Sequence, residues 1–298
     1  MCAMKVTDFT KKGEFVKIVE LLPPKELNLD KLEQRVSLIQ DHADFISLTS
    51  KKEAYAVTSL DAASSLSLRG AVRAEFIAHI TLIEFGEIRE LPFIRLMGAH
   101  RFGVGNLLVM RGDGEFAGGS YCYACDLVKA ICDMNRGTDP SGNRCEPTDF
   151  CIGAVISQYR DREEEFKAAR AKRINGAEYF ITQMCFDPYC EGRHEEYSYP
   201  AFCERLFDFL GERVPVIAGV PIPDRSTIRF IEEKGATDPI YIPDAVRRRI
   251  LESKDDKEER ITIAREVLSY FRDDIGVPGV DVFSTGNVKL ASRILEES

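Results

Sequence analysis

We predict a (β/α)8 barrel, an α/β fold, from three features of this 298-residue sequence. Eight short runs rich in Val and Ile follow one another, and parallel strands buried on both faces have this composition. Helix-like stretches separate most of the runs, as a repeated strand–helix unit requires. A polar or charged residue ends nearly every run, and enzymes with this fold carry their chemistry at the carboxyl ends of the strands. The predicted strands are Phe15–Leu22, Phe45–Thr49, Phe76–Leu82, Asn106–Arg111, Phe150–Ile156, Glu178–Gln183, Val214–Gly219 and Val280–Ser284.

Helices are predicted between these strands. Asn28 is expected to cap the first of them, because an apolar stripe at helical spacing follows it. A helix over Arg162–Ile174 begins with acidic and ends with basic residues, which suits the helix dipole. A long helix is expected after Lys257, and an extra one over Asp244–Glu252. Loops are predicted over Asp113–Ser120 and Arg136–Thr148, which are rich in turn residues.

The overall charge and hydropathy exclude several classes of partner. The sequence has 49 acidic and 40 basic residues and a net charge of -9, which argues against a nucleic acid or an anionic membrane as partner. No apolar segment is long enough to span a bilayer, and Met1–Lys12 lacks the apolar core of a signal peptide. We expect a cytoplasmic protein with one domain over residues 1–298.

The nine cysteines are expected to be reduced thiols, because disulfides are rare in the cytosol. Eight of them fall between Cys122 and Cys203, but only Cys122 and Cys125 form a CxxC pair. A metal site usually needs two tight pairs or a compact run of four. We therefore expect no metal. The alternative is a site built from Cys122, Cys125, Cys185 and Cys190.

Glu20 is the candidate acid of the predicted rim. It lies among Val and Leu residues late in the first strand, and desolvation there would raise its pKa toward that of a general acid at neutral pH. The alternative is that Glu20 points outward and pairs with a cation on a covering helix. The run of residues is compatible with both orientations.

Other strand ends supply hydrogen-bonding groups. His79 is either a structural residue or a ligand contact, and Arg111-Gly112-Asp113 is either a polar turn or a Gly-relaxed turn that presents both charges to a ligand. Gln183 either caps its strand or recognises a heteroaromatic edge. The sequence has no Ser-His-Asp order, no Walker loop and no Rossmann glycine spacing. These residues alone predict a barrel enzyme for a small organic molecule.

Ordered blocks over residues 15–287 give the chain a resemblance to a known family. The resemblance is to methylenetetrahydrofolate reductase, and the Glu-Pro-Pro-like, Arg-Gly-Asp and Ile-Thr-Gln blocks are specific when they occur together. The blocks are Val19-Glu20-Leu21-Leu22-Pro23-Pro24-Lys25, Phe45-Ile46-Ser47-Leu48-Thr49, Ala78-His79-Ile80-Thr81, Leu108-Val109-Met110-Arg111-Gly112-Asp113, Tyr123-Ala124-Cys125-Asp126-Leu127-Val128, Gly176-Ala177-Glu178-Tyr179-Phe180-Ile181-Thr182-Gln183 with Phe186-Asp187, and Pro215-Val216-Ile217-Ala218-Gly219.

The resemblance implies a barrel that binds FAD without a covalent bond. Hydride would pass from NADH or NADPH to the flavin and then to 5,10-methylenetetrahydrofolate, giving 5-methyltetrahydrofolate for one-carbon metabolism and methionine biosynthesis. Glu20 matches the general acid that opens the methylene bridge to an iminium, and Asp113 the aspartate beside flavin and pterin. Gln183 matches the glutamine that contacts folate and nicotinamide in turn, and Phe230 an aromatic that packs on substrate. Thr49, His79, Arg111, Gly112, Tyr123, Ala124 and Lys172 match flavin-contacting positions, and Glu165 stands for an acid that holds the ribityl or ribose part.

The chain departs from the family pattern at several of these positions. Glu20 precedes Leu-Leu where the family often has Phe-Phe, Ser157 stands where the family has Tyr, and many relatives carry an Arg near Asn287, which would bind the glutamate of folate. No long C-terminal extension follows, so we expect the regulatory S-adenosylmethionine domain of the family to be absent. A homo-oligomer is expected. Two alternatives stay open: a catalytic subunit that receives electrons from an iron–sulfur partner subunit, and a non-catalytic barrel that binds folate.

Overall fold

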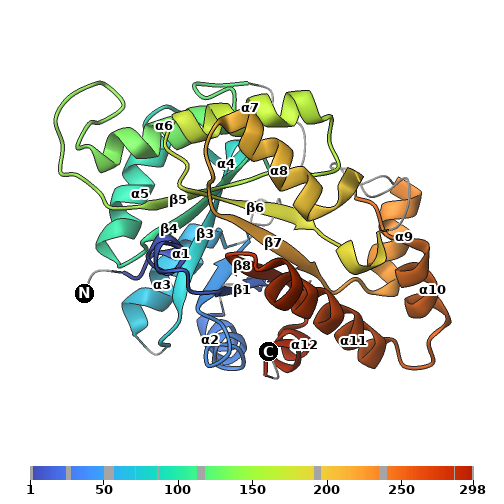
Figure 1. Cartoon of the computed structure of the whole chain (residues 1–298). Coiled ribbons are helices and arrows are strands. Elements are labelled where there is room, and N and C mark those ends of the chain that lie inside the picture. The colour runs from blue at the N-terminus through green and yellow to red at the C-terminus, as the bar shows by residue number, and fades with distance from the viewer. Residues whose placement is uncertain are drawn as a thin grey trace.

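A closed barrel of parallel strands forms the centre of the molecule (Figure 1). The computed structural model describes residues 3–24, 28–49, 57–70, 72–85, 87–112, 118–190, 196–234, 240–284 and 286–296. Within these ranges eight strands follow one another around the barrel in chain order, and β8 pairs with β1 to close it. They are β1 (Val16–Leu21), β2 (Phe45–Leu48), β3 (Glu75–Thr81), β4 (Asn106–Met110), β5 (Cys151–Val155), β6 (Tyr179–Met184), β7 (Val216–Pro221) and β8 (Gly279–Phe283).

The predicted fold is therefore confirmed, and each predicted strand is present with ends that differ by at most two residues. β7 differs most, because it continues to Pro221 rather than ending at Gly219. β6 contains an irregularity between Ile181 and Met184, where its register with β7 shifts. Gln183 lies inside this irregular segment.

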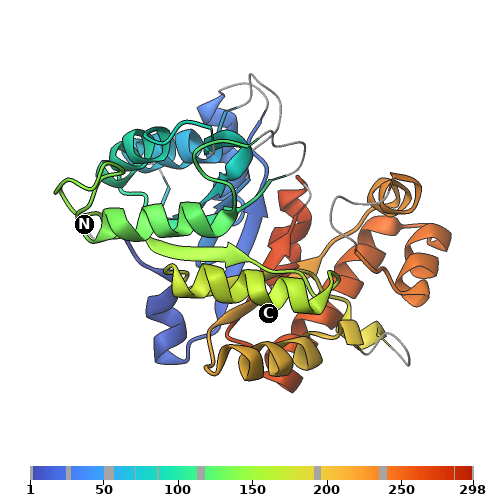
Figure 2. The same ribbon diagram turned by 90° about the horizontal axis from the view of Figure 1, so that it is seen from above.

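Helices surround the barrel on its outer side in both views (Figures 1 and 2). Asn28 caps α2 as predicted, its side chain accepting a hydrogen bond of 2.9 Å from the backbone N–H of Lys31. The predicted helices over Arg162–Ile174 and Asp244–Glu252 are present with those bounds. The described helices are α1 (Val6–Lys12), α2 (Leu29–Ser37), α3 (Ser59–Arg69), α4 (Leu82–Phe85), α5 (Leu91–Arg101), α6 (Ala124–Asn135), α7 (Arg162–Ile174), η1 (Asp187–Tyr189), α8 (Tyr199–Leu210), α9 (Arg225–Lys234), α10 (Asp244–Glu252), α11 (Asp256–Ser269), η3 (Tyr270–Ile275) and α12 (Val288–Leu295).

Helix α1 was not predicted, so the helix after Asn28 is not the first of the chain. It packs against the amino-terminal end of the barrel, where Val6 and Phe9 join the apolar residues of the interior. The backbone N–H of Val6 donates a hydrogen bond of 3.0 Å to Oδ1 of Asn106 at the start of β4. This short helix therefore covers the end of the barrel opposite to the carboxyl ends of the strands.

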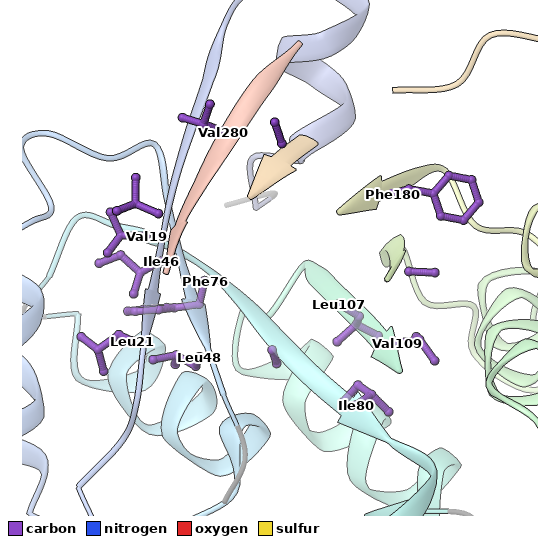
Figure 3. Packing of buried hydrophobic residues seen from close by; sticks show 14 of the residues in the cluster. Val19, Leu21, Ile46, Leu48, Phe76, Ile80, Leu107, Val109, Phe180 and Val280 are labelled. Atoms are coloured by element: carbon purple, nitrogen blue, oxygen red, sulfur yellow. The ribbon is translucent and has the colours of Figure 1, made fainter. Parts of the chain in front are cut away.

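Alternate residues of each strand face two separate apolar layers. One face packs on the helices, and Figure 3 shows Val19, Leu21, Ile46, Leu48 and Val280 in this outer layer. The other face fills the barrel, because a barrel of this size has a packed interior rather than a pore. The interior apolar layer contains Val16, Ile18, Phe45, Ile77, Leu108, Cys151, Tyr179, Ile181 and Ile217.

Helices α9, α10 and α11 form a smaller unit at one side of the barrel, seen together in both views (Figures 1 and 2). Their apolar faces meet Phe186, which follows β6, in a cluster with Ile228, Val246, Ile250 and Ile263. The long helix predicted after Lys257 is α11, which continues as η3. None of the described helices has both the length and the apolar character required to cross a membrane.

Candidate active site

The carboxyl ends of the eight described strands meet at one end of the barrel, because all neighbouring strands are parallel. Glu20 and His79 lie near the ends of β1 and β3, and Gln183 lies near the end of β6. Thr49 follows β2, and Arg111 follows β4. The predicted rim residues of these strands are therefore brought to one end of the molecule.

Glu20 belongs to the inward face of β1. Its neighbours Val19 and Leu21 pack in the outer layer, whereas Ile18, two residues earlier, lies in the interior. The residue keeps some exposure toward the mouth of the barrel, but the surrounding protein excludes water from its carboxyl group. This desolvation raises the pKa of Glu20 to about 7. Of the two orientations compatible with the sequence, the structure shows the inward one.

Asp281 is a second interior carboxyl group, and it is not among the residues predicted from the sequence. It lies on β8 in register with Ile18, and only 1% of its surface is exposed. Among the described residues neither of its carboxyl oxygens has a hydrogen-bond partner. Burial, followed by the nearby charge of Glu20, raises the pKa of Asp281 well above its usual value. The signal in the sequence is a carboxylate between two apolar residues, Val280 and Val282, as Glu20 lies between Val19 and Leu21.

His79 is a neutral interior residue. One ring nitrogen, Nε2, is 2.7 Å from Oγ of Ser47 on the neighbouring strand β2. Burial lowers the pKa of His79 to about 3, so the imidazole carries no charge at neutral pH. Ser47 is in turn the register partner of Glu20. Asp281, Glu20, Ser47 and His79 therefore form a polar belt across four consecutive strands, from β8 to β3.

A second group of polar residues lies over the end of β5. The backbone N–H of Ser157 donates a hydrogen bond of 3.1 Å to Oε1 of Glu165, and Nη1 of Arg160 is 3.7 Å from Oε2. Nζ of Lys172 donates a bond of 2.7 Å to the carbonyl of Val155, the last residue of β5. Ser157, Glu165 and Lys172 are all less than a tenth exposed. Helix α7 thus anchors the segment that follows β5 through two charged side chains.

Two features at the rim would suit a ligand that lies against the backbone. Gly112 has a φ of +84°, and a Cβ there would lie 3.0 Å from Cβ of Thr81. A side chain at position 112 would be strained and would press on Thr81. The glycine allows the backbone after β4 to lie close to the end of β3. Oγ1 of Thr49 is buried and has no hydrogen-bond partner among the described residues.

The remaining predicted residues lie outside these groups. Tyr123 precedes α6 and is 70% exposed, and Ala124 begins that helix. Asn287 precedes α12, and its backbone N–H donates a bond of 2.8 Å to the carbonyl of Ser284. Phe230 lies in α9, but its side chain is outside the described part, as is the whole of Asp113.

A family model decides what kind of protein carries this rim. The model described as methylenetetrahydrofolate reductase matches residues 5–297. The chain belongs to the methylenetetrahydrofolate reductase family. Membership makes it an oxidoreductase that acts on a one-carbon folate. The family assignment made from the ordered sequence blocks is therefore confirmed.

One solved structure supports the fold. Deoxyribose phosphate aldolase from Aeropyrum pernix is 11% identical over 99% of this chain and 98% of its own, with a TM-score of 0.52. A provisionally assigned lyase/mutase from Burkholderia cenocepacia is 14% identical over 98% of this chain and 84% of its own, with a TM-score of 0.47. Among curated proteins, none matches the chain.

The eight described cysteines of this reductase-family chain are all free thiols. Among the described residues no group of three or more His, Cys, Asp or Glu is placed to hold a metal ion. Cys122 is exposed beside α6, whereas Cys185 is buried after β6. Burial raises the pKa of Cys185 well above its usual value and that of Cys190 to about 12, so both stay thiols at neutral pH. The described cysteines are all free of disulfide bonds.

Proposed function

We propose that this chain is a FAD-dependent reductase that converts 5,10-methylenetetrahydrofolate to 5-methyltetrahydrofolate with NADH or NADPH as electron donor. The observation that carries the proposal is Glu20, an inward carboxyl group at the mouth of the barrel whose pKa of about 7 suits a general acid at neutral pH. Family membership supports the folate substrate.

Bound FAD would supply the group that accepts hydride from the nicotinamide and delivers it to the folate. Oγ1 of Thr49, which has no partner in the described part of the chain, and the closely packed backbone at Gly112 fit a planar ligand lying across the rim. Neutral His79 adds no charge beneath such a ligand. In this proposal the residues that hold FAD are Thr49, His79, Arg111, Gly112, Asp113, Tyr123, Ala124, Ser157, Glu165 and Lys172.

Glu20 performs the proton transfer in the proposed reaction. The proton leaves the carboxyl oxygen of Glu20 and forms an N–H bond on a bridging nitrogen of the folate, and the bond from that nitrogen to the methylene carbon breaks. A carboxyl group with an ordinary pKa would already be ionised at neutral pH, so burial is what keeps this proton available. Asp113 would stabilise positive charge that develops on the substrate, since the two charges are opposite.

Three further residues are proposed to bind substrate. Gln183, in the irregular segment of β6, has an amide that both donates and accepts hydrogen bonds to a pterin ring. Phe230 of α9 would pack on the substrate, and Asn287 would contact its glutamate end. We also propose a single-domain chain that works in the cytoplasm as a homo-oligomer.

The visible absorbance spectrum of the purified chain, before and after anaerobic addition of NADH, tests the proposal. Flavin bands that bleach with NADH, followed by reoxidation with methylenetetrahydrofolate, are the expected result. Bands that persist with NADH but bleach with a chemical reductant would favour an iron–sulfur partner subunit as electron donor. A chain that shows no flavin bands after reconstitution with FAD would contradict the proposal and favour a non-catalytic folate-binding barrel.

A further inference from the structure

Apart from Glu75 at its amino-terminal edge, the interior of the barrel contains two carboxyl groups and, among the described residues, no cation that could neutralise them. The titratable residues on the inward faces of the described strands are Glu20, Glu75, His79, Cys151, Tyr179 and Asp281. His79 is uncharged because its pKa is about 3, and burial keeps Cys151 and Tyr179 protonated. At the amino-terminal end, Lys5 is engaged by Asp149. Ionising both acids would place two unpaired negative charges in one apolar space.

The two acids lie at different depths. Asp281 pairs in register with Ile18, and Glu20 comes two residues later on the same face of β1. With the usual rise per strand residue, Glu20 is about 7 Å further along β1 toward its carboxyl end than the register partner of Asp281. Asp281 also faces Gly219 of β7, which offers no side chain. Glu20 therefore lies nearer the carboxyl end of the paired strands than Asp281 does.

Depth decides which acid keeps its proton. An ionised carboxylate without partners in an apolar interior is so costly that the group becomes neutral instead. Asp281 is 1% exposed and both its oxygens lack partners among the described residues, whereas Glu20 keeps some exposure to the rim. The first proton to leave the pair is therefore that of Glu20, and Asp281 remains a neutral acid. A neutral acid in an apolar site can donate a hydrogen bond at pH 7.

We propose that Asp281 is a positioning residue which stays protonated while Glu20 works, and whose O–H stabilises the Glu20 carboxylate left after proton transfer. This inference rests on the proposed function of Glu20. The O–H of Asp281 acts directly, by rotation of its side chain, or through one water. No charge accumulates in the interior beyond the single negative charge on Glu20, because the proton of Asp281 does not leave.

Two substitutions of Asp281 distinguish this role from the alternatives. Asp281→Leu keeps the branched shape of the side chain but has no donor. The pKa of Glu20 should therefore rise, and the alkaline limb of the pH–rate profile of the folate step should move upward by about one pH unit. Asp281→Asn keeps an N–H donor and should return the limb to within about 0.3 pH unit of wild type. The rate at which NADH reduces the flavin serves as the readout that neither change should move. A limb that moves downward in both variants would mean that Asp281 is ionised and would overturn the proposal. If the alkaline limb stays in place in both variants, Asp281 has only a structural role, and this result also overturns the proposal.

Infrared titration of the purified chain gives a readout that does not depend on folate turnover. At pH 8 the wild type should show the band of a buried protonated carboxyl group, and this band should be absent in Asp281→Asn but present in Glu20→Gln. Glu20 and Asp187 should both contribute to the carboxyl absorbance that is lost as the pH rises through about 7. The contribution of Glu20 should disappear in Glu20→Gln and shift upward in Asp281→Leu, and that of Asp187 should disappear only in Asp187→Asn. If folate turnover is absent but these bands behave as described, the proposed function fails while the assignment of Asp281 stands. A wild-type chain without a carboxyl band at pH 8 contradicts the assignment itself.

Discussion

Oγ of Ser284 donates a hydrogen bond of 2.6 Å to the backbone carbonyl of Glu20, a residue 264 positions earlier in the chain. This bond joins the segment after β8 to β1 at the residue that bears the candidate acid. Ser284 is fully buried, and its Oγ also accepts a bond of 3.3 Å from the backbone N–H of Gly286. The closure of the barrel and the position of the acid therefore depend on the same hydroxyl group.

Replacing Ser284 by Ala should affect both stability and activity. Loss of the hydroxyl leaves the Glu20 carbonyl and the Gly286 N–H without this partner, so the free energy of unfolding should fall by about 1–2 kcal/mol. The folate step should slow several-fold because the β1 end is held less firmly. Urea unfolding and single-turnover kinetics measure the two effects. Ser64→Ala is the matched control, because Oγ of Ser64 bonds the carbonyl of Leu60 inside α3, far from the rim. Equal rates in the two variants would contradict the positional role of Ser284.

Glu20→Gln should separate the two half-reactions. The amide has nearly the same shape but no acidic proton, so flavin binding and its reduction by NADH should persist while folate reduction falls by about 10²-fold or more. Stopped-flow absorbance of each half-reaction provides the measurement. Glu75→Gln, at the amino-terminal end of β3, offers the control for a carboxyl group remote from the rim. Undiminished folate turnover in Glu20→Gln would remove this residue from the acid role.

The folate step should depend on pH through Glu20. Because the protonated carboxyl group is the active form and its pKa is about 7, the rate should be constant below that pH and decline above it. The decline should approach tenfold per pH unit, since a single proton is lost. Single-turnover oxidation of the prereduced protein between about pH 5.5 and 9 tests this. A rate that stays flat over the whole range would contradict the acid role, whereas the NADH half-reaction is expected to lack this limb.

Asp187 should make stability depend on pH independently of the rim. Burial raises its pKa to about 7, although Oδ1 accepts a bond of 2.6 Å from the backbone N–H of Tyr199, and Oδ2 has no partner among the described residues. The folded state thus holds this proton to a higher pH than the unfolded state does. Its contribution to stability is fully present below about pH 4 and is lost as the pH rises to about 7.

Asp187→Asn does not titrate and should lack that loss. The difference in unfolding free energy between variant and wild type should therefore shift in favour of the variant by about 4 kcal/mol between about pH 4 and pH 8. Urea unfolding at a series of pH values measures it. Asp139 is exposed and its pKa is lowered by the backbone N–H of Asn143, so Asp139→Asn gives a control with the opposite sign. A difference that is independent of pH in Asp187→Asn would refute the explanation.

Gly153 tests how closely the barrel interior is packed. A Cβ at Gly153 would lie 2.3 Å from Cζ of Tyr179, a contact that forces the buried ring or the strand to move. Gly153→Ala should therefore destabilise the fold by about 1–3 kcal/mol or more. Gly98 lies in α5, and a methyl group there would meet nothing within 4 Å, so Gly98→Ala should stabilise by about 0.5–1 kcal/mol through helix propensity. Thermal melts of both variants compare them, and equal melting temperatures would contradict the packing argument.

The strands could be predicted from the sequence because strands buried on both faces are apolar throughout. The same property hides the orientation of Glu20, since Val16–Leu21 shows no alternation that separates inward from outward residues. Helix α1 is missing from the prediction because its seven residues are mostly polar and only two are buried. Asp281 carries the same signal as Glu20, but it lies inside its strand, whereas the predicted rim was built from strand ends such as Ser284. Contacts such as Ser47 with His79 depend on barrel closure, which no local pattern encodes.

Helix α1 closes the amino-terminal end of the barrel. Val6 and Phe9 pack beneath the interior layer, so the amino-terminal end of the packed barrel is closed and the rim is its open end. Water and protons reach the two acids from the rim, and a ligand bound across the rim would block this access. While such a ligand is bound, the protons of Glu20 and Asp281 are cut off from bulk water. If the proposed ligands bind there, proton exchange of the two acids would be coupled to ligand binding and release.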